Sequence, residues 1–143
     1  MSKRKTRQAE IRRVVRTERL RTQQEIADRL VRAGFPCTQA TVSRDIVEMG
    51  LKKVAGGIYA LPEDLHLHRM FTDLVTGVLP SEQLVIVKTL AGGAQGVAAA
   101  LDAAVFPQVL GSIAGDDTVL LITGSAAEAA ALVSALHKYR SGL

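Results

Sequence analysis

The stretch Thr38-Gln-Ala-Thr-Val-Ser-Arg-Asp-Ile-Val-Glu-Met-Gly50 carries the signals of a helix with two different faces. Thr38 can accept hydrogen bonds from the free amides of a first turn, and Gly50 can supply the left-handed residue that ends a helix. The apolar residues between them recur at helical spacing and predict one buried stripe, formed by Val42, Ile46 and Met49. We therefore predict a helix between Thr38 and Gly50.

The other side chains of this helix are short or polar. Those opposite the stripe are Thr41, Arg44 and Glu48, and those in the first turns are Gln39, Ala40 and Ser43. A helix that presents Gln, Thr, Ser and Arg without bulky obstruction suits the major groove of DNA. An ordinary amphipathic helix with a solvated face explains the same pattern, so the neighbouring segments must decide between the two.

Charge is divided unevenly along the 143 residues. Residues 1–62 contain 14 Lys and Arg against 6 Asp and Glu, a net charge of +8, whereas residues 63–143 contain 4 against 8, a net charge of −4. A basic domain of this size predicts a polyanionic partner, and nucleic acid before a membrane.

The segments around the helix predict a winged helix-turn-helix over residues 1–62. After a basic tail at 1–7, an apolar helical face runs through 7–17. Thr22-Gln-Gln-Glu25 is a capping box, and it opens a second helix. The buried side of that helix is predicted to hold Ile26, Ala27, Leu30 and Val31. Two β-prone runs, 51–54 and 58–61, flank Gly56-Gly57 and predict a hairpin. With the net charge, this arrangement favours DNA binding.

Two lysines of the hairpin, Lys52 and Lys53, are placed to reach phosphate oxygens, which orient a protein on DNA without reading its sequence. The predicted DNA-binding residues are Gln23, Gln39, Thr41, Ser43, Arg44, Lys52 and Lys53.

Residues 63–70 are predicted to form a polar linker. His66 and His68 in this segment could bind a metal ion, but no cysteine or third ligand lies nearby in the sequence, so we predict no metal site.

Residues 71–143 alternate between strand and helix signals. Apolar runs predict strands over 75–79, 84–87, 109–114 and 119–123, with a helix from 94 to 104 between the second and third. A further helix is predicted from about 67 to 74. Ser125-Ala-Ala-Glu128 is a second capping box that opens a last helix, with Leu132, Leu136 and Tyr139 on its packed side. The predicted fold class is therefore α+β, with the winged helix joined to an α/β sandwich that has its helices on one side. So small a sheet buries little apolar surface alone, which predicts oligomerisation.

Asp116 and Asp117 form the only tight acidic pair between two apolar runs, in Gly115-Asp-Asp-Thr118. A β-turn rich in turn-forming residues explains the pair without any ligand. Two carboxylates can also hold one planar guanidinium by bidentate hydrogen bonds. Gln95 and Asp102, seven residues apart in the predicted 94–104 helix, share a face and could add acceptors.

The combination of Thr38-Gln-Ala-Thr-Val-Ser-Arg-Asp45 with Gly111-Ser-Ile-Ala-Gly-Asp-Asp-Thr118 resembles the bacterial arginine repressor family. The resemblance covers nearly the whole chain, because Gly50-Leu-Lys-Lys53, Val87-Lys-Thr89 and Ala94-Gln95 also follow in family order. One departure is Ala91 before Gly92, where the family often has proline.

The resemblance implies an arginine-dependent regulator that represses arginine biosynthesis genes. It implies that the winged helix binds double-stranded operator DNA, with Ser43 and Arg44 as principal contacts. It implies that the C-terminal domain forms trimers that pair into hexamers, with L-arginine as the effector between trimers. The L-arginine-binding residues would be Gln95, Asp102, Asp116 and Asp117.

Two other functions remain open on the sequence. An enzyme would need more than the partial glycine-rich run Gly92-Gly-Ala-Gln-Gly96, which lacks the P-loop lysine, and no catalytic triad is evident. An architectural DNA binder without an effector would use the acidic half only for assembly.

The chain has no apolar run of about 18 residues, no apolar segment after its basic start, and a single cysteine, Cys37. These features predict a cytoplasmic protein without a resident cofactor or a membrane partner.

Overall fold

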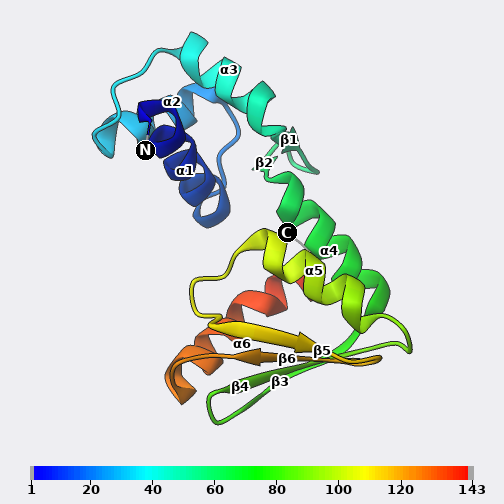
Figure 1. Cartoon of the computed structure of the whole chain (residues 1–143). Helices are drawn as coiled ribbons and strands as arrows, with labels where there is room; N and C mark the ends of the chain where they lie inside the picture. Colours follow the sequence, from blue (N-terminus) through cyan, green and yellow to red (C-terminus); the bar gives the residue numbers. More distant parts are fainter. Residues whose placement is uncertain (1, 142–143) are drawn as a thin grey trace. The chain divides into compact units, whose positions relative to one another are not determined.

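The computed structural model describes residues 2–141, and the chain divides into two compact units at Pro62 and Glu63. The N-terminal unit contains α1 (Lys3–Thr17), α2 (Gln23–Arg32), α3 (Gln39–Met49) and the strands β1 (Lys52–Lys53) and β2 (Tyr59–Ala60) (Figure 1). The two strands pair antiparallel, with Lys52 opposite Ala60 and Lys53 opposite Tyr59. Three helices and a hairpin follow one another as the sequence predicts.

Each helix of the N-terminal unit begins at a hydroxyl side chain that accepts a backbone hydrogen bond. Ser2 accepts from Lys5 N, Thr22 from Glu25 N and Thr38 from Thr41 N. These bonds satisfy amides that would otherwise lack a partner in the first turn. At the other end of α3, Gly50 has φ 70°, the left-handed conformation that glycine adopts at little cost. The predicted limits of α3 are confirmed.

The three helices pack around an apolar core to which every helix contributes. Ile11, Ile26, Leu30 and Val42 are fully buried there, and Met49 packs at its edge. One residue is wrongly predicted, because Val31 is 55% exposed. A helix buries one stripe, and Ile26, Ala27 and Leu30 already fill it.

The start of the chain also differs from its prediction. Residues 3–7 belong to α1 and do not form a separate tail, because Ser2 caps the helix and Arg7 is held by a partner on α3.

The C-terminal unit is built on one antiparallel sheet of four strands. Its elements are α4 (Pro62–Leu74), β3 (Val75–Ser81), β4 (Leu84–Thr89), α5 (Ala94–Ala104), β5 (Gly111–Ala114), β6 (Thr118–Ile122) and α6 (Ala126–Ser141). The strand order is β3-β4-β6-β5, so α5 carries the chain from β4 across β6 to the edge strand β5 (Figure 1). The α+β fold class is thus confirmed.

The two faces of this sheet differ because successive side chains of a strand alternate. Val85 and Val87 of β4 and Val119 and Leu121 of β6 are fully buried, in a core shared with α4, α5 and α6. The opposite face carries a row of aliphatic residues that pair directly across the four strands: Leu79, Ile86, Leu120 and Ile113. Leu79 and Ile113 in this row are 46% and 64% exposed.

Residues 63–70 are not the linker that the sequence predicts, since they lie within α4. Leu67 and Phe71 of this helix are buried in the C-terminal core, and His68 Nδ1 lies 2.9 Å from the Tyr139 carbonyl oxygen of α6. Proline at the first helical position with Glu63 and Asp64 after it is a helix-start signal that the polar composition hides.

Candidate functional site

Two side chains from α1 hold α3 in place through its buried carboxylate, Asp45, which is only 2% exposed. Arg7 donates from Nε and Nη2 to the two carboxylate oxygens, the second at 3.0 Å, and Gln8 donates to Oδ1 at 3.1 Å. A bidentate guanidinium–carboxylate pair restricts both distance and angle. The orientation of α3 against α1 is therefore set by directional bonds as well as by apolar packing.

The charge state of Asp45 follows from this pairing. Burial opposes ionisation of the carboxyl, but the hydrogen bonds from Arg7 and Gln8 and the charge of Arg7 outweigh it, so the pKa of Asp45 is lowered. The second acidic residue of α3, Glu48, accepts from Arg4 Nη1 at 3.0 Å and from Gln8 Nε2 at 2.6 Å. Both carboxylates of α3 are thus engaged by α1.

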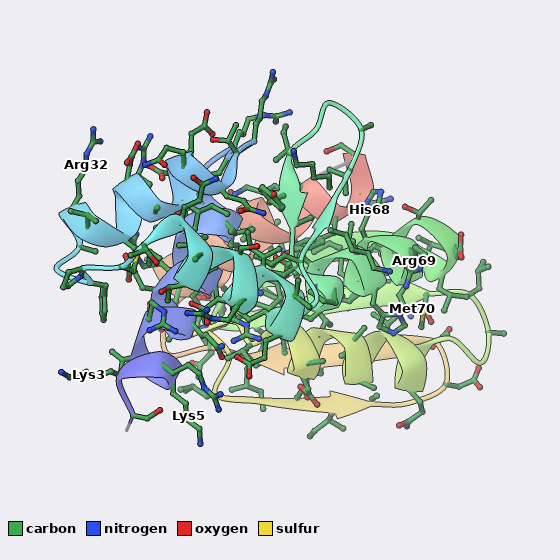
Figure 2. All side chains as sticks on the ribbon, turned by 90° about the horizontal axis from the view of Figure 1, so that it is seen from above. Lys3, Lys5, Arg32, His68, Arg69 and Met70 are labelled. Atoms are coloured by element: carbon green, nitrogen blue, oxygen red, sulfur yellow. The ribbon has the colours of Figure 1, made fainter. Side chains whose placement is uncertain are left out.

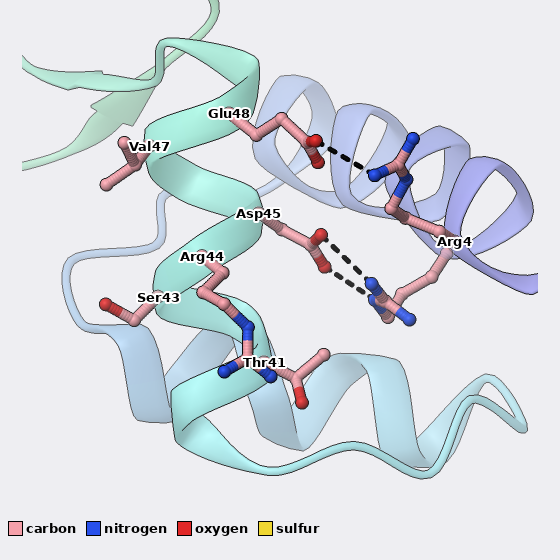
Figure 3. A pocket seen from close by; sticks show the side chains of 8 residues that line it. Arg4, Thr41, Ser43, Arg44, Asp45, Val47 and Glu48 are labelled. Atoms are coloured by element: carbon pink, nitrogen blue, oxygen red, sulfur yellow. Dashed lines mark hydrogen bonds and ion pairs between the residues drawn. The ribbon is translucent and has the colours of Figure 1, made fainter.

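The rest of α3 presents the side chains that the sequence predicts as DNA contacts. Gln39 and Arg44 are exposed, and Thr41 and Ser43 are half-buried. An open concavity of about 420 Å³ lies against the helix, lined by Thr41, Ser43, Arg44, Asp45 and Val47 together with Arg4, Arg7 and Glu48 (Figure 3). Figure 3 shows Asp45 and Glu48 turned toward α1, whereas Ser43 and Val47 lie on the other side of α3.

The remaining predicted DNA contacts lie outside α3. Gln23 is the first residue of α2 and is half-buried, and Lys52 and Lys53 are exposed on β1. The Lys53 ammonium lies 5.1 Å from the centre of the Tyr59 ring, its partner across the hairpin. Further basic side chains, Lys3 and Lys5 of α1 and Arg32 of α2, project outward from this unit (Figure 2).

In the C-terminal unit, Asp116 and Asp117 occupy a tight turn between β5 and β6. Gly115 N donates to Thr118 O at 2.9 Å and closes the turn. The carbonyl oxygens of the two aspartates accept from the Ala94 and Thr89 amides at 3.1 and 2.8 Å. The turn is therefore fixed at the end of β4 and the start of α5, with both carboxylates exposed.

Asp117 already has a compensating cation within its own subunit. Lys88 Nζ lies 3.6 Å from Asp117 Oδ1 and donates to the Thr118 hydroxyl, which in turn donates to Asp117 Oδ1 at 2.9 Å. The Thr118 hydrogen bond and the charge of Lys88 lower the pKa of the Asp117 carboxyl. The register of the sheet explains the contact, because Lys88 and Thr118 are direct partners across β4 and β6.

Of the other two predicted effector residues, the structure brings one to this turn. Gln95, in the first turn of α5, donates from Nε2 to the Ala114 carbonyl oxygen at 2.9 Å. Asp102 lies two helical turns further on, a rise of ~10 Å, and its Oδ1 accepts from Ser112 at 3.2 Å. Both side chains are exposed, and both face the edge strand β5.

The remaining candidates from the sequence are a metal site at His66 and His68 and the glycine-rich run from Gly92 to Gly96. Among residues 2–141, no group of three or more His, Cys, Asp or Glu side chains could hold a metal ion. In the glycine-rich run, Gly92 turns the chain at φ 77° and a side chain at Gly96 would meet the Met70 methyl at 2.7 Å. This run serves the turn before α5 and its packing on α4. No helix in the described residues is long and apolar enough to cross a membrane.

The sequence does not predict the roles of two residues at these sites. Asp45 lies within the stretch from Thr38 to Gly50, but its partner Arg7 is 38 residues away in the sequence. Lys88 directly follows the apolar run 84–87 and lies on the face of β4 opposite the core, and a lysine at such a position is a signal that could have linked it to the Asp pair.

Known proteins match this chain over both units. Residues 2–67 match the family described as "Arginine repressor, DNA binding domain", and residues 71–138 match "Arginine repressor, C-terminal domain". Three similar proteins, each named arginine repressor, come from Carboxydothermus hydrogenoformans, Pelotomaculum thermopropionicum and Desulforudis audaxviator. They are 48%, 41% and 45% identical, over 81%, 95% and 83% of this chain and 85%, 97% and 86% of their own lengths. Since the matches cover both units in order, this chain belongs to the arginine repressor family.

Proposed function

We propose that this protein is an L-arginine-responsive transcriptional regulator that binds operator DNA through its N-terminal unit and represses arginine biosynthesis genes. The observation that carries the proposal is the match of one chain to both the DNA-binding and the C-terminal domain of the arginine repressors. A repressor family binds DNA and does not catalyse a reaction, so the enzyme alternative is set aside. Because the partner is chromosomal DNA, we also propose a cytoplasmic location.

Three features support the DNA-binding half of the proposal. The unit is strongly basic, and α3 presents Gln39, Ser43 and Arg44 without a bulky obstruction. The acidic residues of the same helix are engaged by α1 and do not oppose phosphate groups. We therefore assign base contacts to α3 and phosphate contacts to Lys52 and Lys53, with Gln23 and Thr41 at the border of the same surface.

The effector half rests on the turn at Asp116 and Asp117. Arginine carries a planar guanidinium whose paired N–H groups match a carboxylate, which an ammonium cannot do. Gln95 and Asp102 offer further acceptors along α5. Because Lys88 already neutralises Asp117, the ligand must either add to this pair or displace the ammonium.

Assembly of the C-terminal unit completes the proposal. The open face of the sheet carries the aliphatic row of Leu79, Ile86, Leu120 and Ile113, and exposed apolar surface of this kind marks contacts between proteins. We propose that C-terminal units form trimers that pair into hexamers, with L-arginine bound between trimers. Binding of L-arginine then favours the paired state and, by linkage, tightens DNA binding.

The test is operator binding by the full chain with and without millimolar L-arginine. The wild type should bind about 5- to 150-fold more tightly with L-arginine, the range of a coupling of ~1–3 kcal/mol. Asp117→Asn should keep basal DNA binding and lose this response, and L-lysine should substitute poorly.

Glu82→Gln, which removes an exposed acid from the β3–β4 turn of the same unit, is the matched control and should respond fully. A full response in Asp117→Asn would place the effector elsewhere. A wild type that binds DNA equally with and without L-arginine would favour the architectural alternative.

A further inference from the structure

Val47 differs from the other branched aliphatic residues of α3 because it is 79% exposed, whereas Val42 and Ile46 are buried in the N-terminal core. Single exposed valines are common on protein surfaces, so exposure alone assigns no role. The position of this valine on the helix is what matters.

Val47 lies on the line of α3 that carries the polar side chains proposed to read DNA. It follows Ser43 by four residues and Gln39 by eight, and residues at this spacing lie above one another on a helix. It follows Arg44 by three residues, which also brings the two side chains to neighbouring positions. Figure 3 shows Val47 beside Ser43, on the side of α3 remote from the α1 contacts.

The acidic residues of α3 leave this line free of negative charge. Asp45 and Glu48 both turn to α1, where Arg7, Arg4 and Gln8 satisfy them. The exposed line therefore combines an amide, a hydroxyl and a guanidinium with two apolar side chains, Val47 and the shorter Ala40. Valine is branched at Cβ and holds one rotamer in a helix, so its methyl groups are already in place before a partner binds.

The major groove of DNA offers one apolar group that such a side chain fits. Its base edges are hydrogen-bond donors and acceptors, apart from the C5 methyl group of thymine, which proteins contact with aliphatic side chains. An amide, a hydroxyl and a guanidinium can each form hydrogen bonds to base edges, but none of them offers this methyl group a favourable apolar contact. On this line the apolar side chains of Ala40 and Val47 can offer one, and the longer side chain of Val47 reaches further from the helix.

We propose that Val47 contacts the C5 methyl group of a thymine and so adds a preference for thymine beside the base pair that Arg44 contacts. The inference rests on the proposed binding of α3 in the major groove. Three helical residues rise ~4.5 Å, whereas successive base pairs are ~3.4 Å apart. The thymine should therefore lie one or two base pairs from the position at which Arg44→Ala relaxes selectivity.

The experiment uses the full-length protein with saturating L-arginine. A preferred duplex is selected from random DNA, and each thymine is then replaced singly by deoxyuridine, which removes only the methyl group. At one thymine of each half-site, the wild type should lose about fourfold in affinity, because burying one methyl-sized group is worth ~0.8 kcal/mol and a tenfold change ~1.4 kcal/mol. Val47→Ala should bind the thymine and uracil duplexes within about twofold of each other.

Val31→Ala is the matched control, since Val31 is also an exposed helical valine, 55% exposed on α2. It should keep the full discrimination between thymine and uracil. If no thymine shows a methyl effect in the wild type, or if Val47→Ala keeps the effect, the inference is overturned while selective binding still supports the proposed function. If the wild type selects no duplex at all, the proposed function itself fails.

Discussion

Asp45 is a charged residue within the N-terminal core, and its pairing with Arg7 makes stability depend on pH. Asp45→Asn should destabilise the unit by about 1.5–3 kcal/mol at pH 7, the range for hydrogen bonds to charged groups. Since the folded-state pKa of Asp45 is lowered, the contribution is present above the unfolded pKa of about 3.9 and is lost as the pH falls through the lower folded value. Urea unfolding of both proteins at pH 7 and pH 3 would measure this.

Glu48→Gln is the control variant. Both side chains of the Glu48–Arg4 ion pair are exposed, so the pair should contribute at most about 1 kcal/mol to the free energy of unfolding. A difference between wild type and Asp45→Asn that stays constant from pH 7 to pH 3 would contradict the role given to the ion pair.

Arg44, exposed on α3, is expected to supply selectivity rather than general affinity. A bidentate contact between arginine and guanine discriminates by ~1–3 kcal/mol, so Arg44→Ala should lose about 5- to 150-fold on operator DNA and much less on scrambled DNA. Gel shifts on both duplexes at several salt concentrations would measure the two losses. Equal losses on the two duplexes would show that Arg44 does not read bases.

At the scale of elements, the β1–β2 hairpin is expected to act through charge. Lys52 and Lys53 are consecutive residues of β1, so their side chains leave opposite faces of the hairpin. The Lys53 ammonium lies over the ring of Tyr59, its partner across the hairpin. Lys53→Ala should weaken binding to operator and scrambled DNA alike, and should flatten the dependence of log affinity on log salt by about one unit.

Lys138→Ala, an exposed lysine on α6 of the C-terminal unit, is the matched control for the hairpin and should leave the salt slope unchanged. A larger loss on the operator than on scrambled DNA would mean that the hairpin lysine reads sequence.

At the scale of the whole molecule, the position of α4 decides which fragment can fold alone. A fragment of residues 63–143 keeps Leu67 and Phe71, which are buried in the C-terminal core, and should fold and assemble as the full chain does. A fragment of residues 72–143 lacks both side chains, whose truncation typically costs several kcal/mol, and should be much less stable. Light scattering and thermal unfolding of the two fragments would decide, and a monomeric 63–143 fragment at micromolar concentration would contradict the prediction.

The sequence by itself determined the features that depend on neighbours along the chain. The hydroxyl caps at Thr22 and Thr38, the left-handed Gly50 and the apolar stripe of α3 are local signals, and each appears where it is predicted. The buried strands around Val85 and Leu121 likewise follow from runs of apolar residues. Local signals succeed because the hydrogen bonds of a helix and the alternation of a strand are set by residues a few positions apart.

Only the tertiary structure decided which distant residues meet. The pairing of Asp45 with Arg7, the contact of Lys88 with Asp117 and the strand order β3-β4-β6-β5 all join segments far apart in the sequence. The structure also decided the role of α4, whose polar composition resembles a linker. Leu67 and Phe71 of this helix are buried in the C-terminal core. Whether a charged side chain or an apolar helix face is buried depends on the segment that packs against it. That segment is distant in the sequence, so a local pattern cannot identify it.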